Sequence, residues 1–169
     1  DTVEQYIFLS QIIPDYNEEK LYLKIDYQIS EQDESSKVQS GITLKQTALY
    51  PLNVATGVYE DPLIIPPYED VETDGYTKTV HKLAYDFLGI TDSGWFFFTI
   101  GDATGYSVLL VQPNGQKILS RHLDIDPEET LYQSFSLSHA GIISALIVKN
   151  NEANVCWWRT DSIINSFLK

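Results

Sequence analysis

The chain has 169 residues, a formal net charge of −13 and 43 % hydrophobic residues, a composition that excludes a disordered polar chain and allows a sizeable core. No run of about 18 apolar residues occurs, so no membrane span is predicted, and the negative charge makes nucleic acid a poor partner. The single cysteine excludes an internal disulfide and a cysteine-based zinc cluster. Met is absent even at position 1, so we expect that an upstream export signal has been removed.

Short strand-like segments dominate the chain. They are rich in β-branched and aromatic residues, and turn residues bound most of them. In chain order, the predicted strands cover 6–13, 21–30, 42–49, 82–90, 95–101, 106–112, 117–123, 132–138, 142–148 and 154–160. The predicted turns cover 91–94, 102–105, 113–116, 138–141 and 149–152. Only residues 161–168 suggest a helical turn, so the sequence predicts an all-β fold.

Two segments interrupt this series of strands. Residues 31–37 are polar, and we expect them to form a loop. Residues 50–80 are rich in Pro, Tyr and acidic residues, and we expect them to form a long connecting loop. Loops of that length inside a domain tend to be functional or mobile.

An internal repeat with an offset of 47 residues relates two C-terminal parts of the chain. Residues 85–112 align on residues 132–159 without a gap, so that turn falls on turn and apolar run on apolar run. A weaker third copy covers residues 6–49. The segments WFFFTI, VLLV, IISALIV and VCWW are continuously apolar, which is typical of strands buried on both faces.

The period and the strand pattern resemble β-propeller repeats of the sort found in bacterial exported proteins and lipoproteins. The Trp-Asp dipeptide, the paired glycines of kelch repeats and the Tyr-Trp-Thr-Asp motif are missing, so the resemblance selects no subfamily. It implies about three blade-like antiparallel sheets, with a β-sandwich as the alternative. The implied divisions are a weak first blade in 1–49, the connecting loop in 50–80, a second blade in 81–130 and a third in 131–169.

Three blades are too few to close a ring, because propellers typically have about four to eight. The chain is therefore part of a longer, incomplete propeller, or other chains complete it, or its sheets stack as an open sandwich. The last unit ends after three strands, and we predict that residues 4–12 complete it by pairing beside residues 154–162.

The segment NVCWWR is then an inner strand with two buried faces. Period-2 alternation places Val155 and Trp157 on one face and Cys156 and Trp158 on the other. We expect the substitution Trp157→Ala to cost about 3–5 kcal/mol of stability.

No catalytic signature is present in the sequence. The histidines at 81, 122 and 139 lack the HExxH spacing, and neither a GxSxG elbow nor a phosphate-binding glycine loop occurs. Cys156 lies in an apolar run, which favours burial over reactivity. The sequence therefore favours a non-catalytic protein, with a propeller-type hydrolase or a carbohydrate-binding module as the alternatives.

One acidic segment has part of a calcium-binding pattern. Asp70, Glu72, Asp74 and Gly75 match the opening of a calcium loop, but His81 stands where the bidentate Glu is required. We predict no cofactor, and a Ca²⁺ site at the three acidic residues is the alternative.

Exposed tyrosines next to Pro and acidic residues indicate a contact surface. The candidate binding residues are Tyr59, Tyr68 and Tyr76, together with Arg159 and Asp161 at the exit of the last strand. We predict an extracytoplasmic binding or scaffold module of a larger exported protein or lipoprotein, acting through protein–protein contacts. Its partner is another protein or the remaining blades of the same propeller, and oligomerisation is compatible with both.

Overall fold

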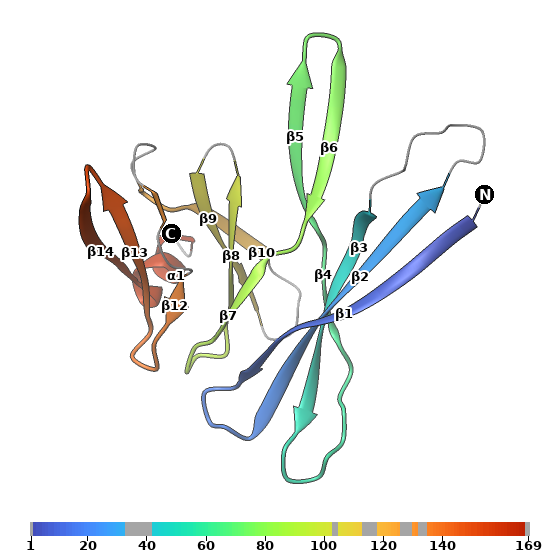
Figure 1. The fold of residues 1–169 in the computed structure, drawn as a ribbon. Coiled ribbons are helices and arrows are strands. Elements are labelled where there is room, and N and C mark those ends of the chain that lie inside the picture. Colours follow the sequence, from blue (N-terminus) through green and yellow to red (C-terminus); the bar gives the residue numbers. More distant parts are fainter. Residues whose placement is uncertain are drawn as a thin grey trace. The chain divides into compact units, whose positions relative to one another are not determined.

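Figure 1 shows a computed structural model that describes residues 2–32, 42–102, 105–112, 118–125, 130–131 and 135–167. These residues form antiparallel sheets and one short helix, which confirms the predicted all-β class. None of the described sheets closes on itself. The chain divides into two compact units, Asp1–Tyr85 and Asp86–Lys169, which are taken in turn.

Unit 1 is built on a four-stranded antiparallel sheet. Its strands, in sheet order, are β1 (Thr2–Pro14), β2 (Lys20–Gln32), β3 (Ile42–Asn53) and β4 (Leu63–Ile65). The turn between β1 and β2 is held by the Asp15 carboxylate, which accepts hydrogen bonds from the backbone N–H groups of Glu19 (2.8 Å) and Lys20 (3.1 Å). The three strands predicted at 6–13, 21–30 and 42–49 are confirmed, and each is longer than predicted.

The segment predicted as a long loop contains strands instead. After β4, the chain forms a two-stranded hairpin of β5 (Tyr68–Asp74) and β6 (Thr77–Leu83), which projects from the end of β4 in Figure 1. Gly75 begins its two-residue turn with φ +57°, and a glycine at that position suits a type II′ turn. The expectation of one connecting loop over residues 50–80 was therefore wrong.

The first sheet of unit 2 is buried on both faces. Its strands are β7 (Asp86–Ile90), β8 (Phe96–Asp102), β9 (Gly105–Val111) and β10 (Ile118–His122), in the sheet order β10-β9-β8-β7. Phe97 and Leu110 lie fully buried on one face, and Phe98 and Leu109 lie buried on the other. This confirms the prediction that WFFFTI and VLLV are covered on both sides.

The second sheet of unit 2 is centred on one long hairpin. Its elements are β11 (Thr130–Leu131), β12 (Ser136–Leu137), β13 (Ile142–Lys149) and β14 (Glu152–Arg159), and α1 (Thr160–Phe167) follows. β14 pairs with β13 along its whole length, and β11 and β12 pair with the two ends of β13. Asn150 and Asn151 both have positive φ (52° and 64°), as a type I′ turn requires.

The 47-residue repeat predicted from the sequence is present in the backbone geometry. In the turn before β8, Thr91 N donates to Trp95 O (3.0 Å), Gly94 N donates to Thr91 O (2.9 Å), and Thr91 Oγ1 accepts from Trp95 N (3.2 Å). The same three bonds recur before β13, from Ser138 N to Ile142 O (2.9 Å), from Gly141 N to Ser138 O (3.0 Å), and from Ile142 N to Ser138 Oγ (3.2 Å).

The strand register repeats with the same offset. Phe97 faces Leu110 across β8 and β9, and Ser144 faces Trp157 at the equivalent place across β13 and β14. Every pair from Phe96↔Val111 to Asp102↔Gly105 has its counterpart from Ile143↔Trp158 to Lys149↔Glu152. The two hairpins are therefore copies of one structural unit.

One hydrophobic cluster joins the two sheets and the helix of unit 2. It contains Trp95, Phe97, Val108 and Leu110 from the first sheet, Ile143, Ala145 and Ile147 from the second, and Ile163 and Ile164 from α1. Thr160 fixes the start of α1, because its Oγ1 and its N–H both donate to the carbonyl of Gly141.

The predicted pairing of residues 4–12 beside 154–162 was wrong. β1 pairs with β2 in the sheet of unit 1, whereas β14 pairs with β13 in unit 2. The local reason is the short turn after Pro14, which folds the chain back on itself. Because of this turn, β1 pairs with β2 over nearly the whole length of β1.

Candidate functional site

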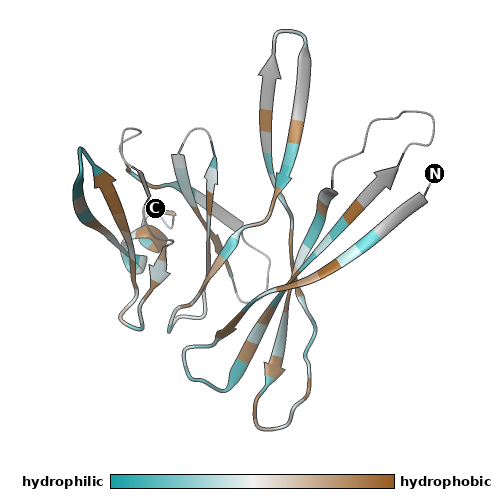
Figure 2. Cartoon of the chain, viewed as in Figure 1, coloured by the Kyte–Doolittle hydropathy of each residue, from teal (hydrophilic) through white to brown (hydrophobic). Residues whose placement is uncertain are grey.

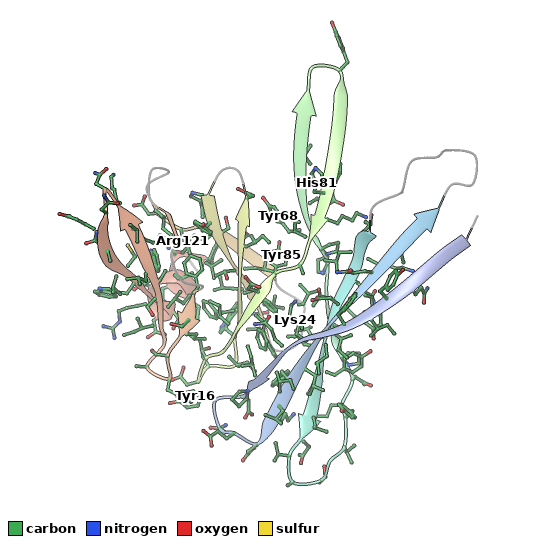
Figure 3. All side chains as sticks on the ribbon, in the orientation of Figure 1. Tyr16, Lys24, Tyr68, His81, Tyr85 and Arg121 are labelled. Carbon is green, nitrogen blue, oxygen red and sulfur yellow. The ribbon has the colours of Figure 1, made fainter. Side chains whose placement is uncertain are left out.

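The predicted tyrosines do not form one surface. Tyr59 lies in the connection between β3 and β4 and makes an isolated bridge with Leu52. Tyr68 begins β5 and packs edge-on against Tyr85, with a ring separation of 5.9 Å. Both residues are labelled in Figure 3. Tyr76 is fully exposed at the tip of the β5–β6 hairpin. Tyr59 and Tyr76 are thus exposed and Tyr68 is half-buried, and a contact role for the three tyrosines stays a prediction.

The predicted acidic metal residues lie on a strand. Asp70, Glu72 and Asp74 occupy alternate positions of β5. Their strand is extended, whereas a calcium loop wraps its ligands around the ion. The side chains of these three residues lie outside the part of the chain that the structure describes, and a Ca²⁺ site there stays a prediction.

Arg159 and Asp161 flank the junction between β14 and α1. Arg159 is the last residue of β14, Asp161 is in the first turn of α1, and both are exposed. Arg159 belongs to the same sheet face as Val155 and Trp157, because the three residues alternate along β14.

The expectation that both faces of NVCWWR are buried was wrong. Trp158 lies half-buried against the unit 2 cluster, and Phe135 is its neighbour at a ring separation of 6.1 Å. Trp157 is 60 % exposed and Val155 is 66 % exposed. The alternation was predicted correctly, but only the face with Cys156 and Trp158 packs on the first sheet.

We call the exposed side of this hairpin the Trp157 face. It comprises Ile142, Ser144, Leu146 and Val148 of β13 and Ala153, Val155, Trp157 and Arg159 of β14. The repeat relates the Trp157 face to one face of the first sheet. In that sheet, Leu110 occupies the position equivalent to Trp157, and Val108 occupies the position equivalent to Val155. Both counterparts have no exposed surface, because the second sheet covers them. The Trp157 face therefore has the composition of a face that is covered elsewhere in the same unit.

Unit 1 has a second exposed apolar face, which we call the uncharged face. The sheet register places on it Ile7, Leu9 and Ile12 of β1, Leu23, Ile25 and Tyr27 of β2, Ala48 and Tyr50 of β3, and Ile64 of β4. Its paired positions within residues 5–14, 21–29, 43–52 and 63–65 contain no charged residue. Ile7 is 65 % exposed and Ile12 is 56 % exposed, and Figure 2 shows the apolar stretches of these strands in brown.

The opposite face of the same sheet contains a buried ion pair. Lys24 Nζ lies 2.8 Å and 3.0 Å from the two carboxylate oxygens of Asp26, and it donates to Ser10 Oγ at 3.1 Å. Thr47 Oγ1 donates to the same carboxylate at 2.5 Å. Burial alone would raise the pKa of Asp26, but hydrogen bonds from Lys24, Thr47 and Ser10 outweigh it and hold the pKa below its usual value. Lys24, Asp26 and Thr47 are buried and joined by hydrogen bonds, and we assign this cluster to the structure of the sheet.

The uncharged face has one polar contact at its surface. The hydroxyl oxygens of Tyr27 and Tyr50 lie 2.9 Å apart on neighbouring strands. This hydrogen bond raises the pKa of the Tyr27 hydroxyl, with further contributions from desolvation and from the Tyr50 charge. The Tyr27 hydroxyl therefore stays protonated and neutral at physiological pH.

The described ranges contain no group of three or more His, Cys, Asp or Glu residues positioned to hold a metal ion. His81 lies on β6, His122 ends β10, and His139 lies in the turn before β13, so the three histidines come from separate elements.

No family model, curated protein or solved structure matches this chain. Among the described residues, no helix is long and apolar enough to cross a membrane.

Sequence reasoning did not find the uncharged face. Its signal was nevertheless present, because β1 has no charged residue from Gln5 to Pro14 and β2 alternates Leu23, Ile25 and Tyr27 with the charged pair. The charged pair suggests an exposed side, but the structure buries Lys24 and Asp26 and exposes the apolar side. The cross-strand neighbours Thr47 and Ser10, distant in sequence, supply hydrogen bonds to the buried pair.

Proposed function

We propose that this chain is a non-catalytic binding or scaffold module that acts through protein–protein contacts. The observation that supports this proposal is the uncharged face of the β1–β4 sheet. Monomeric soluble proteins rarely expose contiguous apolar patches larger than a few hundred Å², and larger patches mark interaction sites. Here, apolar side chains from all four strands share one exposed face, with Tyr27 and Tyr50 as amphipathic contact residues.

We further propose that the sheets are blade-like repeats of the propeller type. The support is the 47-residue offset, which relates the hydrogen bonds and the register of two successive hairpins. In both propellers and solenoids, each repeat buries its apolar faces against its neighbours. An extracytoplasmic location as part of an exported protein or lipoprotein stays a prediction from the resemblance.

A capture experiment with matched variants tests the binding proposal. The wild-type chain is immobilised and exposed to an extract of its source cells, and retained proteins are quantified by mass spectrometry. The variant Ile12→Glu places a charge on the uncharged face. The variant Val58→Glu places the same charge at an aliphatic residue of similar exposure (60 %), in the connection between β3 and β4.

A partner that is retained by the wild type and by Val58→Glu, but lost with Ile12→Glu, supports the proposal. Equal retention by all three proteins contradicts it. Thermal melts of the three proteins serve as the folding control, because both substitutions are at exposed positions and should change stability by less than about 0.5 kcal/mol.

A further inference from the structure

The two hairpins of the internal repeat differ at one sheet edge. In the first sheet, β10 pairs antiparallel with the outer edge of β9. The segment that follows β10 by the repeat offset of 47 residues begins at Asn165, which lies in α1 and not in a strand. Among the described strands, β14 pairs with β13 alone, so the outer edge of β14 is open (Figure 1).

The first sheet shows which backbone groups of β14 face this open edge. The carbonyl of Tyr106 accepts a hydrogen bond from Leu123 N (2.7 Å), on the side of β9 where β10 lies. Backbone groups alternate in direction along an antiparallel strand, so those of Val108 and Leu110 also face β10. The repeat makes these three residues equivalent to Ala153, Val155 and Trp157. The N–H and C=O groups of that second set therefore face the open edge of β14.

This edge lacks the features that protect the other sheet edges within the described strands. Folded proteins protect edge strands with bulges, Pro, charged residues or very short strands. β1 and β7 contain bulges, β4, β11 and β12 have three residues or fewer, and β5, β6 and β10 contain charged residues. β14 has no bulge, and its residues 153–158 include neither Pro nor a charged side chain.

We propose that β14 binds an extended segment of another protein as an added strand, antiparallel to β14 and in the register that β10 has on β9. β10 lies opposite residues 107–111, so the bound segment lies opposite residues 154–158. Strand addition of this kind gains affinity from backbone hydrogen bonds and specificity from alternate side chains.

The chemistry of the bound segment follows from β14 and from β10. Trp157 is 60 % exposed, so an apolar residue opposite it buries the most surface, and Leu119 occupies the equivalent place opposite Leu110. β10 has the sequence ILSRH with no acidic residue, and the net charge of −13 disfavours an acidic partner. The partner segment is therefore extended, non-acidic and apolar opposite Trp157. This edge shares no residue with the uncharged face, so its test is separate from the test of the proposed function.

The experiment uses a capped peptide with the sequence of residues 117–123, KILSRHL, added to the isotope-labelled full chain. NMR measures the exchange of each backbone amide with deuterium. In the free chain, the amides of Val155 and Trp157 should exchange quickly, while those of Asn154 and Cys156 face β13 and should be protected. The peptide should protect the amides of Val155 and Trp157, with a Kd of about 100 μM or tighter.

N-methylated peptides test the register. The N–H groups of Leu119 and Arg121 point toward β9, because they alternate in step with the bonded N–H of Leu123. N-methyl groups at these two positions remove two hydrogen bonds and should weaken binding at least about tenfold. The control peptide has N-methyl groups at Ser120 and His122, whose N–H groups point away from β9, and it should bind as the unmodified peptide does.

A substitution in β14 tests the same edge from the side of the protein. Val155→Pro removes an N–H that faces the open edge and no hydrogen bond to β13. It should weaken binding of the peptide at least about fivefold, whereas Val155→Thr keeps this N–H and should bind within about twofold of the wild type. Thermal melts check the folding of both variants. If Val155→Pro does not fold, the comparison of the two N-methylated peptides decides the outcome.

Three results would overturn the inference. Unchanged exchange of the Val155 and Trp157 amides with about 1 mM peptide shows that no strand of this type binds. Equal weakening by the two N-methylated peptides excludes the register of β10. Protection of the same amides when the chain alone is concentrated shows that a second copy occupies the edge. In each case, retention of a partner that depends on Ile12 would leave the proposed function standing.

Discussion

Alanine substitutions at the two adjacent tryptophans of β14 should have very different effects on stability. Trp158 packs against the unit 2 cluster and lies 6.1 Å from Phe135 between ring centroids. Its replacement removes a core contact and should cost about 3–5 kcal/mol. Trp157 is 60 % exposed, so of the roughly 250 Å² that a tryptophan can bury, about 100 Å² is covered. At about 25 cal/mol per Å², and with a compact unfolded chain as the reference, Trp157→Ala should cost about 1–2 kcal/mol.

Urea denaturation followed by fluorescence measures this difference directly. All three tryptophans lie in unit 2, and the buried Trp95 remains as the reporter of unit 2 in both variants. The titrations should be repeated at several dilutions, because self-association would make the unfolding midpoint depend on protein concentration. A loss for Trp157→Ala that equals the loss for Trp158→Ala at the lowest concentration would refute the assignment of the two faces. Equal losses would instead indicate that both faces of β14 are buried within a single chain.

Two further substitutions test the buried cluster and the repeated turn. Asp26→Asn should cost about 3–5 kcal/mol, because the buried Lys24 ammonium loses its counter-charge. The pKa of Asp26 is lower in the folded protein than in the unfolded chain, where it is about 3.9. The stabilisation by the Asp26 carboxylate is therefore present above about pH 3.9 and is lost as the pH falls through the folded pKa. The double variant Lys24→Met/Asp26→Leu lacks this carboxylate and should lose less stability between about pH 5 and pH 3 than the wild type. Gly141→Ala should lower the melting temperature more than Gly57→Ala does. Both glycines have φ +69°, but of the two only a Cβ at position 141 would lie 2.7 Å from the Thr160 hydroxyl oxygen. Equal decreases in melting temperature would contradict this role for Thr160.

Features set by local chemistry were predictable from the sequence. The pattern Thr/Ser-x-x-Gly at 91–94 and 138–141 provides a hydroxyl acceptor and a residue that tolerates positive φ, and both turns form the same hydrogen bonds. Asn150 and Asn151 likewise form the turn that their residue type favours. Because turns fix the register of the strands that follow, the residue pattern alone is enough to reveal the 47-residue repeat.

Exposure of the Trp157 face was not predictable, because burial of a sheet face depends on which other layer of the protein packs against it. The sequences of β9 and β14 are both apolar on two sides, yet Leu110 is buried and Trp157 is exposed. The alternation along each strand is local, whereas the covering layer is a long-range property.

The hairpin of β5 and β6 was missed because of its composition. Pro66, Pro67 and a run of acidic residues indicate a loop, since these residues are depleted in strands. The stronger signal was Gly75-Tyr76, a two-residue turn of the Gly-X type with Val71 and Val80 placed opposite each other at equal distance from it. A register test around each glycine would have found this hairpin.

The net charge of −13 opposes uncontrolled aggregation of a chain with two exposed apolar faces, and it makes a prediction about salt. The proposed contact at the uncharged face is apolar, and added salt screens charges but does not weaken apolar contact. Retention of a partner that depends on Ile12 should therefore persist when the ionic strength is raised from about 0.05 M to about 0.5 M. Loss of this partner with added salt would contradict the proposal, because ion pairs rather than the uncharged face would then supply the attraction.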